Sequence, residues 1–291
     1  MTEEVTRMPP CWDPANQMPS GRPFEAYHMT STTVQPRVMH SHEFYEMYFF
    51  LRGDIRIVTE DVDVCPRRGD VLLFPPHCMH RNQHLNADEP YERFYLYISA
   101  DFLRSVRSAE FDLAAGLDAI LHTSGFHLHL SEAALTELLQ MTDELIAASE
   151  QTSPAEMMLN SCRMGMLLVR AVTLLRASST PGRTDSPGPV NPLLRYLNDH
   201  LTEPVSLDHL AETFYLSKYA LLRAFKEHTG MSIHQYLLAK RILLAQELLT
   251  RGMKPYEVSA SCGFSDYTGF YRAFRQRTGM SPAQYGRVHQ K

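Results

Sequence analysis

The sequence has little of what marks secreted and membrane proteins. It has five cysteines, an odd number without a C-x-x-C pair, and one tryptophan. This pattern favours reduced thiols over a disulfide framework or a zinc ribbon. The most apolar helical stretch, residues 164–175, is interrupted by Arg170 and is shorter than a bilayer requires. Because the opening MTEEVTRMPP also lacks the apolar run of a signal peptide, the sequence predicts a cytoplasmic protein without a membrane segment.

Charge is distributed unevenly along the chain. The 291 residues carry a net charge of −5, and the proportions of hydrophobic residues (44%) and charged residues (21%) are those of a globular protein. Residues 190–291 hold 13 Lys and Arg against 8 Asp and Glu, a net +5, whereas residues 1–189 hold 15 against 25, a net −10. A basic last third on an acidic chain indicates a module for a polyanion, with the remainder serving another purpose.

A linker divides the chain. Ten of the twelve residues in 178–189 (SSTPGRTDSPGP) are Ser, Thr, Pro or Gly, a composition that favours a flexible segment because it buries too little apolar surface to fold. The predicted organisation is an irregular N-terminal segment (1–23), a β-rich sensor domain (24–100), a helical region (101–177), the linker, and a C-terminal domain (190–291).

The patterns on either side of residue 101 differ in period. Short segments such as EMYFFLRGD and RFYLYIS are bounded by turn residues and alternate in polarity, which predicts several short strands in a sandwich or barrel. After Asp101 the apolar residues take helical spacing, with one helix around 135–145 and another over 154–176. Two uses of these helices remain open: they cap the barrel, or they present an apolar stripe to the same stripe of a second subunit.

An internal repeat is the most informative feature. The segment RAFKEHTGMSIHQY at 223–236 recurs as RAFRQRTGMSPAQY at 272–285, with nine identities in fourteen positions at an offset of 49. Two copies of one small unit are therefore present in the C-terminal domain.

Each copy carries the marks of a helix-turn-helix. In the first unit, about 206–229, Ser206 and Ser217 are expected to cap two short helices. In the second, about 255–278, Gly263 suits the turn and either Ser265 or Asp266 caps the following helix.

The second helix of each unit is amphipathic. Leu221 and Phe225, like Phe270 and Phe274, are spaced four residues apart and are expected to face the core, so that basic side chains project from the other side. One such helix is ordinarily a solvated charged face. Two copies joined by a helical rod over 233–249 instead favour reading of the DNA major groove, in which Arg hydrogen-bonds guanine and flanking cations neutralise phosphates.

Residues 190–288 resemble the DNA-binding domain of the AraC/XylS family of bacterial transcription regulators, through the runs LSxxxLxRxFKxxTG and GFxDxxxFxRxFRxxxGxSPxxY. The resemblance implies that the two recognition helices enter successive major grooves about one turn apart. Ser259 in place of the usual alanine and Gly269 inside the second recognition helix depart from the pattern. The residues expected to contact DNA are Lys218, Tyr219, Leu222, Arg223, Lys226, Tyr267, Thr268, Tyr271, Arg272 and Arg275.

The front half carries a second resemblance. His40, His42 and Glu46 form H-x-H-x3-E, and His80 ends a G-x5-P-x4-H run from Gly69, which together resemble the paired motifs of the cupin jelly roll. Alternation on one unbroken strand would place residues 40, 42 and 46 on the same face. Two His and a carboxylate are the ligand set of a divalent metal site with open positions. Three uses stay open: a metal held by His40, His42, Glu46 and His80, the polar lining of an effector site, or a purely structural role.

The second of these cupin motifs, which begins at Gly69, departs from the metal-binding version, because His77 stands where a glycine is usual and position 84 is His instead of Asn. An effector site is therefore a separate expectation, with a carbohydrate as one candidate ligand. The candidate effector-binding residues are His40, His42, Tyr45, Glu46, Tyr48, His80, Arg81 and Tyr95.

Together these features predict a two-domain chain: an all-β cupin jelly roll with appended helices, followed by an all-α tandem helix-turn-helix domain. The predicted protein is not an enzyme. It is expected to be a transcription regulator that binds double-stranded promoter DNA and a small-molecule effector, forms a homodimer and requires no cofactor. The resemblance to the AraC/XylS family further implies an activator that recruits RNA polymerase. The alternatives are a metal-dependent cupin enzyme or metal sensor fused to a DNA-binding domain, and an architectural DNA-binding protein.

Overall fold

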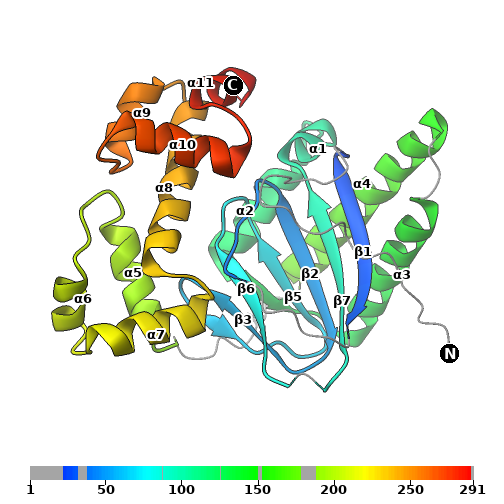
Figure 1. Cartoon of the computed structure of the whole chain (residues 1–291). Helices are drawn as coiled ribbons and strands as arrows, with labels where there is room; N and C mark the ends of the chain where they lie inside the picture. Colours follow the sequence, from blue (N-terminus) through cyan, green and yellow to red (C-terminus); the bar gives the residue numbers. More distant parts are fainter. Residues whose placement is uncertain are drawn as a thin grey trace.

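The computed structural model describes residues 22–31, 38–86, 88–124, 126–149, 153–177 and 188–289. The irregular segment expected over 1–23 lies almost wholly outside these residues, as does the linker expected over 178–189. The described chain forms a β-rich part with its own helices and an all-helical C-terminal part (Figure 1). The predicted fold class is confirmed.

Two antiparallel sheets face each other in the β-rich part. The larger has the order β1 (Phe24–Ser31), β7 (Tyr91–Ile98), β2 (Tyr45–Arg52), β5 (Asp70–Phe74) and β8 (His127–His129). The smaller has the order β4 (Asp63–Val64), β3 (Ile55–Thr59) and β6 (His80–His84). Because successive residues of a strand point to opposite faces, Tyr48 and Tyr95 pack between the sheets, whereas Met47 and Leu96 pack towards the helices. The space between the sheets is therefore lined by only one side of each strand.

The segment before β2 differs from the expectation of one unbroken strand over residues 40–46. His40 forms an isolated bridge with His80, and β2 begins only at Tyr45. Strand β8 was also not expected, since it lies within the helical region. It pairs with β5 at the edge of the larger sheet, where Asp70 lies 2.9 Å from His127 Nε2 and 2.7 Å from His129 Nδ1.

Four helices cover the outer face of the larger sheet: α1 (Ala100–Ser105), α2 (Leu113–Ser124), α3 (Glu132–Ala148) and α4 (Pro154–Ala177). Their apolar sides share one core with the outward-facing residues of β2 and β7. A bidentate ion pair from Arg170 on α4 to Glu137 on α3, with N–O distances of 2.5 and 2.7 Å, joins the last two helices. These helices therefore complete the barrel domain and also present an outer surface of their own.

Helix α4 is longer than the apolar stretch at 164–175 and, at 24 residues, is long and apolar enough to cross a membrane. This corrects the expectation based on that shorter stretch. The helix packs against α2 and α3, and Met164, Leu168 and Leu175 on its inner side belong to the domain core. In this fold α4 is thus a core helix with one exposed side.

Seven helices form the C-terminal part: α5 (Asn191–Asp199), α6 (Leu207–Thr213), α7 (Lys218–Thr229), α8 (Ile233–Thr250), α9 (Pro255–Ser261), α10 (Tyr267–Thr278) and α11 (Pro282–His289). Ser217 caps α7 by accepting from Ala220 N–H, and of the two candidate caps of α10 it is Asp266 that accepts, from Gly269 N–H. Ser206 precedes α6 without a side-chain cap hydrogen bond. Local sequence signals thus set where both recognition helices begin.

Candidate DNA-binding surface and barrel site

Helix α8 holds the two recognition helices, α7 and α10, at a fixed separation (Figure 1). Its first half packs on α7, where the rings of Phe225 and Tyr236 lie 5.6 Å apart. Its second half packs on α10, where Ile242 and Leu249 share a core with Phe270 and Phe274. Since one continuous helix spans both cores, the two units behave as one rigid pair of DNA readers.

Arg241 on α8 joins the two units and was not singled out from the sequence. Its guanidinium donates to the carbonyl oxygens of Leu201, Gly263 and Glu203 at 2.8–2.9 Å. The turn of the second unit is thereby tied to the loop before the first. Only the tertiary structure reveals these acceptors, because carbonyl groups leave no signal in a sequence.

Every residue expected to contact DNA lies on the side of α7 or α10 away from its core. Tyr219 is 75% exposed and Leu222 is 38% exposed, whereas Leu221 beside it is buried. On α10, Tyr267, Thr268, Arg272 and Arg275 are exposed and Tyr271 is half-buried, as Phe270 and Phe274 fill the core. The amphipathic pattern therefore placed these side chains on an accessible surface.

Two of the basic readers are paired with exposed acids. Arg223 Nε donates to Glu227 at 2.8 Å, and Lys218 Nζ lies 2.5 Å from Asp208. Because solvent screens both exposed pairs, exchanging them for phosphate or base contacts costs little.

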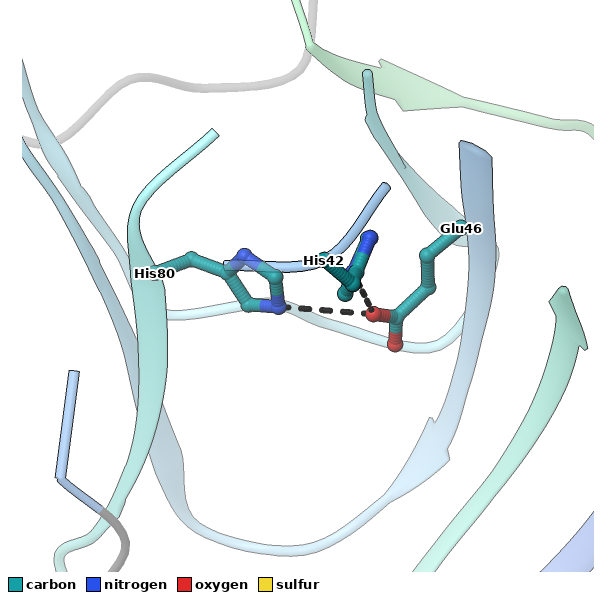
Figure 2. Close-up of side chains that lie close together, drawn as sticks. All are labelled: His42, Glu46 and His80. Atoms are coloured by element: carbon teal, nitrogen blue, oxygen red, sulfur yellow. Dashed lines mark hydrogen bonds and ion pairs between the residues drawn. The ribbon is translucent and has the colours of Figure 1, made fainter. Parts of the chain in front are cut away.

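Between the two sheets, His42, Glu46 and His80 converge on one point (Figure 2). His42 Nε2 lies 2.9 Å and His80 Nε2 lies 3.3 Å from Glu46 Oε2. All three side chains are buried, and their ligating atoms lie within 4.8 Å of one another. We call these three residues the His/Glu triad.

Carbonyl groups orient the histidines of the triad. The Nδ1 atoms of His42 and His80 lie 2.7 and 3.0 Å from the carbonyl oxygens of Phe44 and Cys78, so both Nε2 atoms face Glu46. Burial opposes the charged form of His80, but its hydrogen bonds to Cys78 and Glu46 outweigh this and raise its pKa to about 10. Burial lowers the pKa of His42. For Glu46, burial acts to raise the pKa, but hydrogen bonds with His42 and His80 hold it well below its usual range.

The other candidate residues fall into two groups. Tyr48 and Tyr95 lie on the same interior face as the triad. His40 lies beside His80 at a ring distance of 4.6 Å, but its Nδ1 is 3.1 Å from the Val38 carbonyl and it does not belong to the convergent set. The structure therefore brings together three of the four expected metal ligands and leaves out His40, whose Nδ1 faces the Val38 carbonyl oxygen.

Tyr45 and Arg81 point out of the barrel interior, which corrects their expected place. Tyr45 donates to Asp118 on α2 at 3.0 Å, and Arg81 Nη1 donates to the carbonyl oxygen of Glu227 on α7 at 3.4 Å. Each is next in sequence to a triad residue, so strand alternation turns it to the opposite face.

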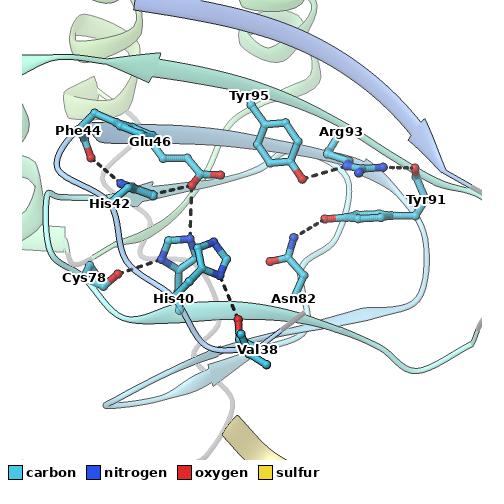
Figure 3. Close-up of polar contacts among 11 residues, drawn as sticks. Val38, His40, His42, Phe44, Glu46, Cys78, Asn82, Tyr91, Arg93 and Tyr95 are labelled. Atoms are coloured by element: carbon cyan, nitrogen blue, oxygen red, sulfur yellow. Dashed lines mark hydrogen bonds and ion pairs between the residues drawn. The ribbon is translucent and has the colours of Figure 1, made fainter. Parts of the chain in front are cut away.

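Three interior residues were missed from the sequence: Asn82, Tyr91 and Arg93 (Figure 3). Asn82 donates to the Tyr91 hydroxyl at 3.0 Å, and that hydroxyl lies 2.5 Å from the Tyr48 hydroxyl. Arg93 and Tyr95 are two residues apart on β7, so their side chains lie on the same face of the strand. The alternation that identified Tyr95 therefore also indicated that Arg93 faces the barrel interior.

The barrel and the DNA-binding part share an interface. Met39, Val58 and Met79 from the barrel enter the apolar core that also holds Leu194 of α5 and Leu221 of α7. Met39 N–H donates to the Thr229 carbonyl oxygen at 2.8 Å. Sensor and reader are thus in direct contact as well as joined by the linker.

Two sensor carboxylates reinforce this interface. Glu60 accepts from Asn198, Lys240 and Tyr236, at 3.1 Å from Asn198 Nδ2 and 3.0 Å from Lys240 Nζ. Glu43 accepts from Gln246 and Tyr285, at 2.5 and 2.7 Å. These contacts reach α8 and α11, so the sensor contacts both halves of the DNA-binding part.

Comparison with known proteins agrees with this architecture. Residues 24–168 match the model of an AraC-like ligand binding domain, and residues 210–287 match a helix-turn-helix domain. The HTH-type transcriptional activator RhaS of Salmonella arizonae is 28% identical over 251 residues, covering 84% of this chain and 85% of the relative. RhaS of Escherichia coli O81 is 28% identical over 261 residues, which cover 87% of this chain and 90% of the relative. Among solved structures, ToxT of Vibrio cholerae is 14% identical to this chain, with a TM-score of 0.37. The match covers 92% of this chain and 99% of the ToxT chain.

The relatives are transcriptional activators, so the prediction of a regulator and not an enzyme is confirmed. The predicted ligand-binding and DNA-binding domains are likewise confirmed.

Proposed function

Because the chain belongs to the AraC/XylS family of transcription regulators, we propose that it is a sequence-specific activator whose barrel binds a small effector that changes its affinity for promoter DNA. The observation that carries this proposal is the pair of recognition helices with accessible outer faces, fixed to one continuous helix, α8. Arg223 and Arg272 read bases, and Lys218, Lys226 and Arg275 neutralise phosphates. The remaining five predicted contacts, Tyr219, Leu222, Tyr267, Thr268 and Tyr271, supply apolar and hydroxyl contacts.

The interior of the barrel is the proposed effector site. The His/Glu triad, Tyr48 and Tyr95 offer hydrogen-bond donors and acceptors on one buried face, which suits a hydroxyl-rich ligand such as a carbohydrate. His80 exchanges two backbone hydrogen bonds with His40, at 2.8 and 2.9 Å, and the adjacent Met39 is bonded to the end of α7. A ligand that shifts His80 therefore acts on a segment bonded to a recognition helix.

A homodimer joined through α4 would place two such proteins on neighbouring half-sites. Met157, Met158, Met166 and Val169 on α4 are exposed, and α4 lines an apolar groove of about 1180 Å³ with α1 and α3. An exposed apolar surface of this kind on a helix is typical of protein association. Light scattering tests the proposed dimer by comparing the mass of the wild-type protein with that of Met166→Glu. Glu144→Gln, an exposed change on α3, is the control. A dimer that dissociates only in Met166→Glu supports it, and a monomeric wild type contradicts it.

RNA polymerase is the remaining proposed partner, since activators act by recruiting it, and the cytoplasm is the proposed compartment. Transcription in vitro from DNA upstream of the gene for this chain, with purified polymerase, tests activation. Increased transcript on adding the protein is expected, and unchanged or reduced transcript contradicts an activator.

A divalent cation is the alternative occupant of the barrel, which would make the protein a metal sensor. The donor set fits, because two buried imidazoles and a carboxylate face one another and carbonyl groups fix both rings. His42, Glu46 and His80 would hold the ion, and His40 would not. Metal analysis of the purified protein and of His42→Ala tests this: stoichiometric metal that His42→Ala lacks supports a metal sensor, and metal-free protein that responds to an organic ligand supports the effector site.

DNA binding in the presence and absence of effectors tests the main proposal. DNA flanking the gene for this chain would be footprinted with the full chain, with and without a panel of sugars. A protected site whose affinity changes with one compound is expected. Equal affinity for that DNA and for random duplex would contradict the proposal.

A further inference from the structure

We infer that the effector carries an anionic group, a carboxylate or a phosphate, and that Arg93 inside the barrel binds it. This inference rests on the proposed function, since it names the chemical class of the molecule that occupies the barrel. It starts from a buried positive charge without a counter-ion.

Arg93 is 4% exposed and lies on β7 with its side chain between the sheets. Its Nε donates to the Tyr95 hydroxyl at 3.0 Å, and its Nη1 donates to Ser31 Oγ at 2.7 Å and to the Tyr91 carbonyl oxygen at 3.0 Å. The guanidinium also lies over the ring of Tyr91, at 4.1 Å from its centroid (Figure 3). All of these partners are neutral.

Among the described residues no carboxylate lies at ion-pair distance from Arg93. A buried charge without a partner of opposite sign is expensive, and proteins ordinarily pair it. Buried acids on this interior face have other partners: Glu46 is engaged by His42 and His80, and Glu25 accepts from the Tyr27 hydroxyl. The positive charge in this half of the barrel is therefore uncompensated by the described protein.

The Nη2 atom of Arg93 has no acceptor among the described residues. A guanidinium has five N–H donors in a planar fork, and the three contacts above use Nε and Nη1. The fork geometry matches a carboxylate or a phosphate. Two donors on a buried cation thus remain for an anion, and the barrel interior is where an effector is expected.

The register of β2 and β7 relates this cation to the His/Glu triad. Glu46 pairs with Tyr97, Tyr48 with Tyr95, and Phe50 with Arg93. Arg93 therefore lies four residues along the strands from the triad, roughly 13 Å away at about 3.3 Å per residue. Tyr48 and Tyr95 lie between the two ends. A molecule with an anionic end at Arg93 and hydroxyl groups towards Glu46 fits this order of side chains, as a sugar acid or a sugar phosphate does.

Matched ligand pairs test the inference. The probes are glucose against glucuronate, galactose against galacturonate, and glucose against glucose 6-phosphate, measured by calorimetry on the full chain. At least one anionic probe is expected to bind about tenfold or more tightly than its neutral partner. The carboxylate and phosphate arms identify which anion the site takes.

Variants assign the effect to Arg93. Arg93→Gln is expected to lose the preference for the anionic probe, and Arg93→Lys, which keeps the charge without the fork, is expected to retain part of it. The exposed Arg52→Gln on the same sheet is the control and should bind as wild type does. Circular dichroism and thermal unfolding establish that the variants are folded, and Arg93→Lys keeps the test valid should Arg93→Gln unfold.

Three results would overturn the inference: a neutral probe that binds as tightly as its anionic partner, an Arg93→Gln protein with wild-type affinity for the anion, or no binding of any anionic probe. The proposed function fails separately. If a neutral compound binds the barrel and changes the affinity for promoter DNA, the inference of an anion at Arg93 is wrong, but the proposed function as an effector-responsive regulator is supported. If the full chain does not distinguish promoter from random DNA, the proposed function itself is wrong.

Discussion

The backbone N–H of Met39 donates to the carbonyl oxygen of Thr229, 2.8 Å away, and so joins the loop before β2 to the last residue of the first recognition helix. Met39 is followed by His40, which is paired through its backbone with His80 of the His/Glu triad. The path from the barrel interior to the DNA-reading surface is therefore short and consists of buried backbone hydrogen bonds.

Removing the charge of Glu60 is expected to destabilise the interface between sensor and reader. In Glu60→Gln the partly buried amide group faces Lys240 and leaves the ammonium group without its carboxylate. Hydrogen bonds to charged groups contribute about 1.5–3 kcal/mol, so a loss of that order in the free energy of unfolding is expected. Denaturant titration measures it.

The matched control is Glu89→Gln. Glu89 lies 3.9 Å from Arg52 in an exposed pair, so its removal is expected to change the free energy of unfolding by less than about 0.5 kcal/mol. Equal losses in the two variants would show that Glu60 does not fasten the interface.

The two arginines of the recognition helices are expected to determine sequence specificity. Arg223→Ala and Arg272→Ala should each lose about 1–3 kcal/mol of discrimination at one base pair. Lys226→Ala should instead weaken binding to all duplexes alike and reduce the salt dependence, because Lys226 is proposed to neutralise a phosphate. Competition binding with a set of singly substituted operators measures both effects. Uniform weakening by all three variants would contradict base reading by the arginines.

Gly263 is expected to be irreplaceable in the turn of the second unit. Its φ is +74°, and an added Cβ would lie 2.4 Å from the carbonyl oxygen of Thr202. Gly263→Ala should therefore lower the free energy of unfolding by more than about 2 kcal/mol. Thermal or denaturant unfolding is the readout.

Gly279 gives the matched comparison. Its φ is +72°, but an added Cβ would meet nothing within 4 Å. Only the backbone strain remains, and Gly279→Ala is expected to cost about 1–2 kcal/mol. If the two substitutions cost the same, the close approach of Thr202 does not determine the requirement for glycine.

Much of the DNA-binding part could be predicted because its signals are local. The repeat revealed two units, and the apolar spacing of Leu221 with Phe225 and of Phe270 with Phe274 identified the buried side of each recognition helix. Helix periodicity carries this information within one or two turns of chain. For the same reason the outer face, with Arg223 and Arg272, followed directly.

The barrel site was less accessible to prediction, since its residues come from separate strands. Tyr45 and Arg81 were wrongly grouped with the interior because they were chosen for their side-chain chemistry. Alternation along β2 and β6, counted from Glu46 and His80, places both on the opposite face. The contacts of Glu60 and Arg241 span 180 and up to 40 residues of sequence. Such partners depend on how the elements pack, and no local pattern indicates them.

Footprinting of the full chain on DNA from its own promoter region, at moderate salt, tests the central claim most directly. The account predicts two protected major-groove segments per protein copy on one face of the duplex, separated by about one helical turn of 10–10.5 base pairs, since α8 fixes the spacing of α7 and α10. Protection that is no stronger on promoter than on shuffled DNA, or a single protected groove per copy, would contradict it.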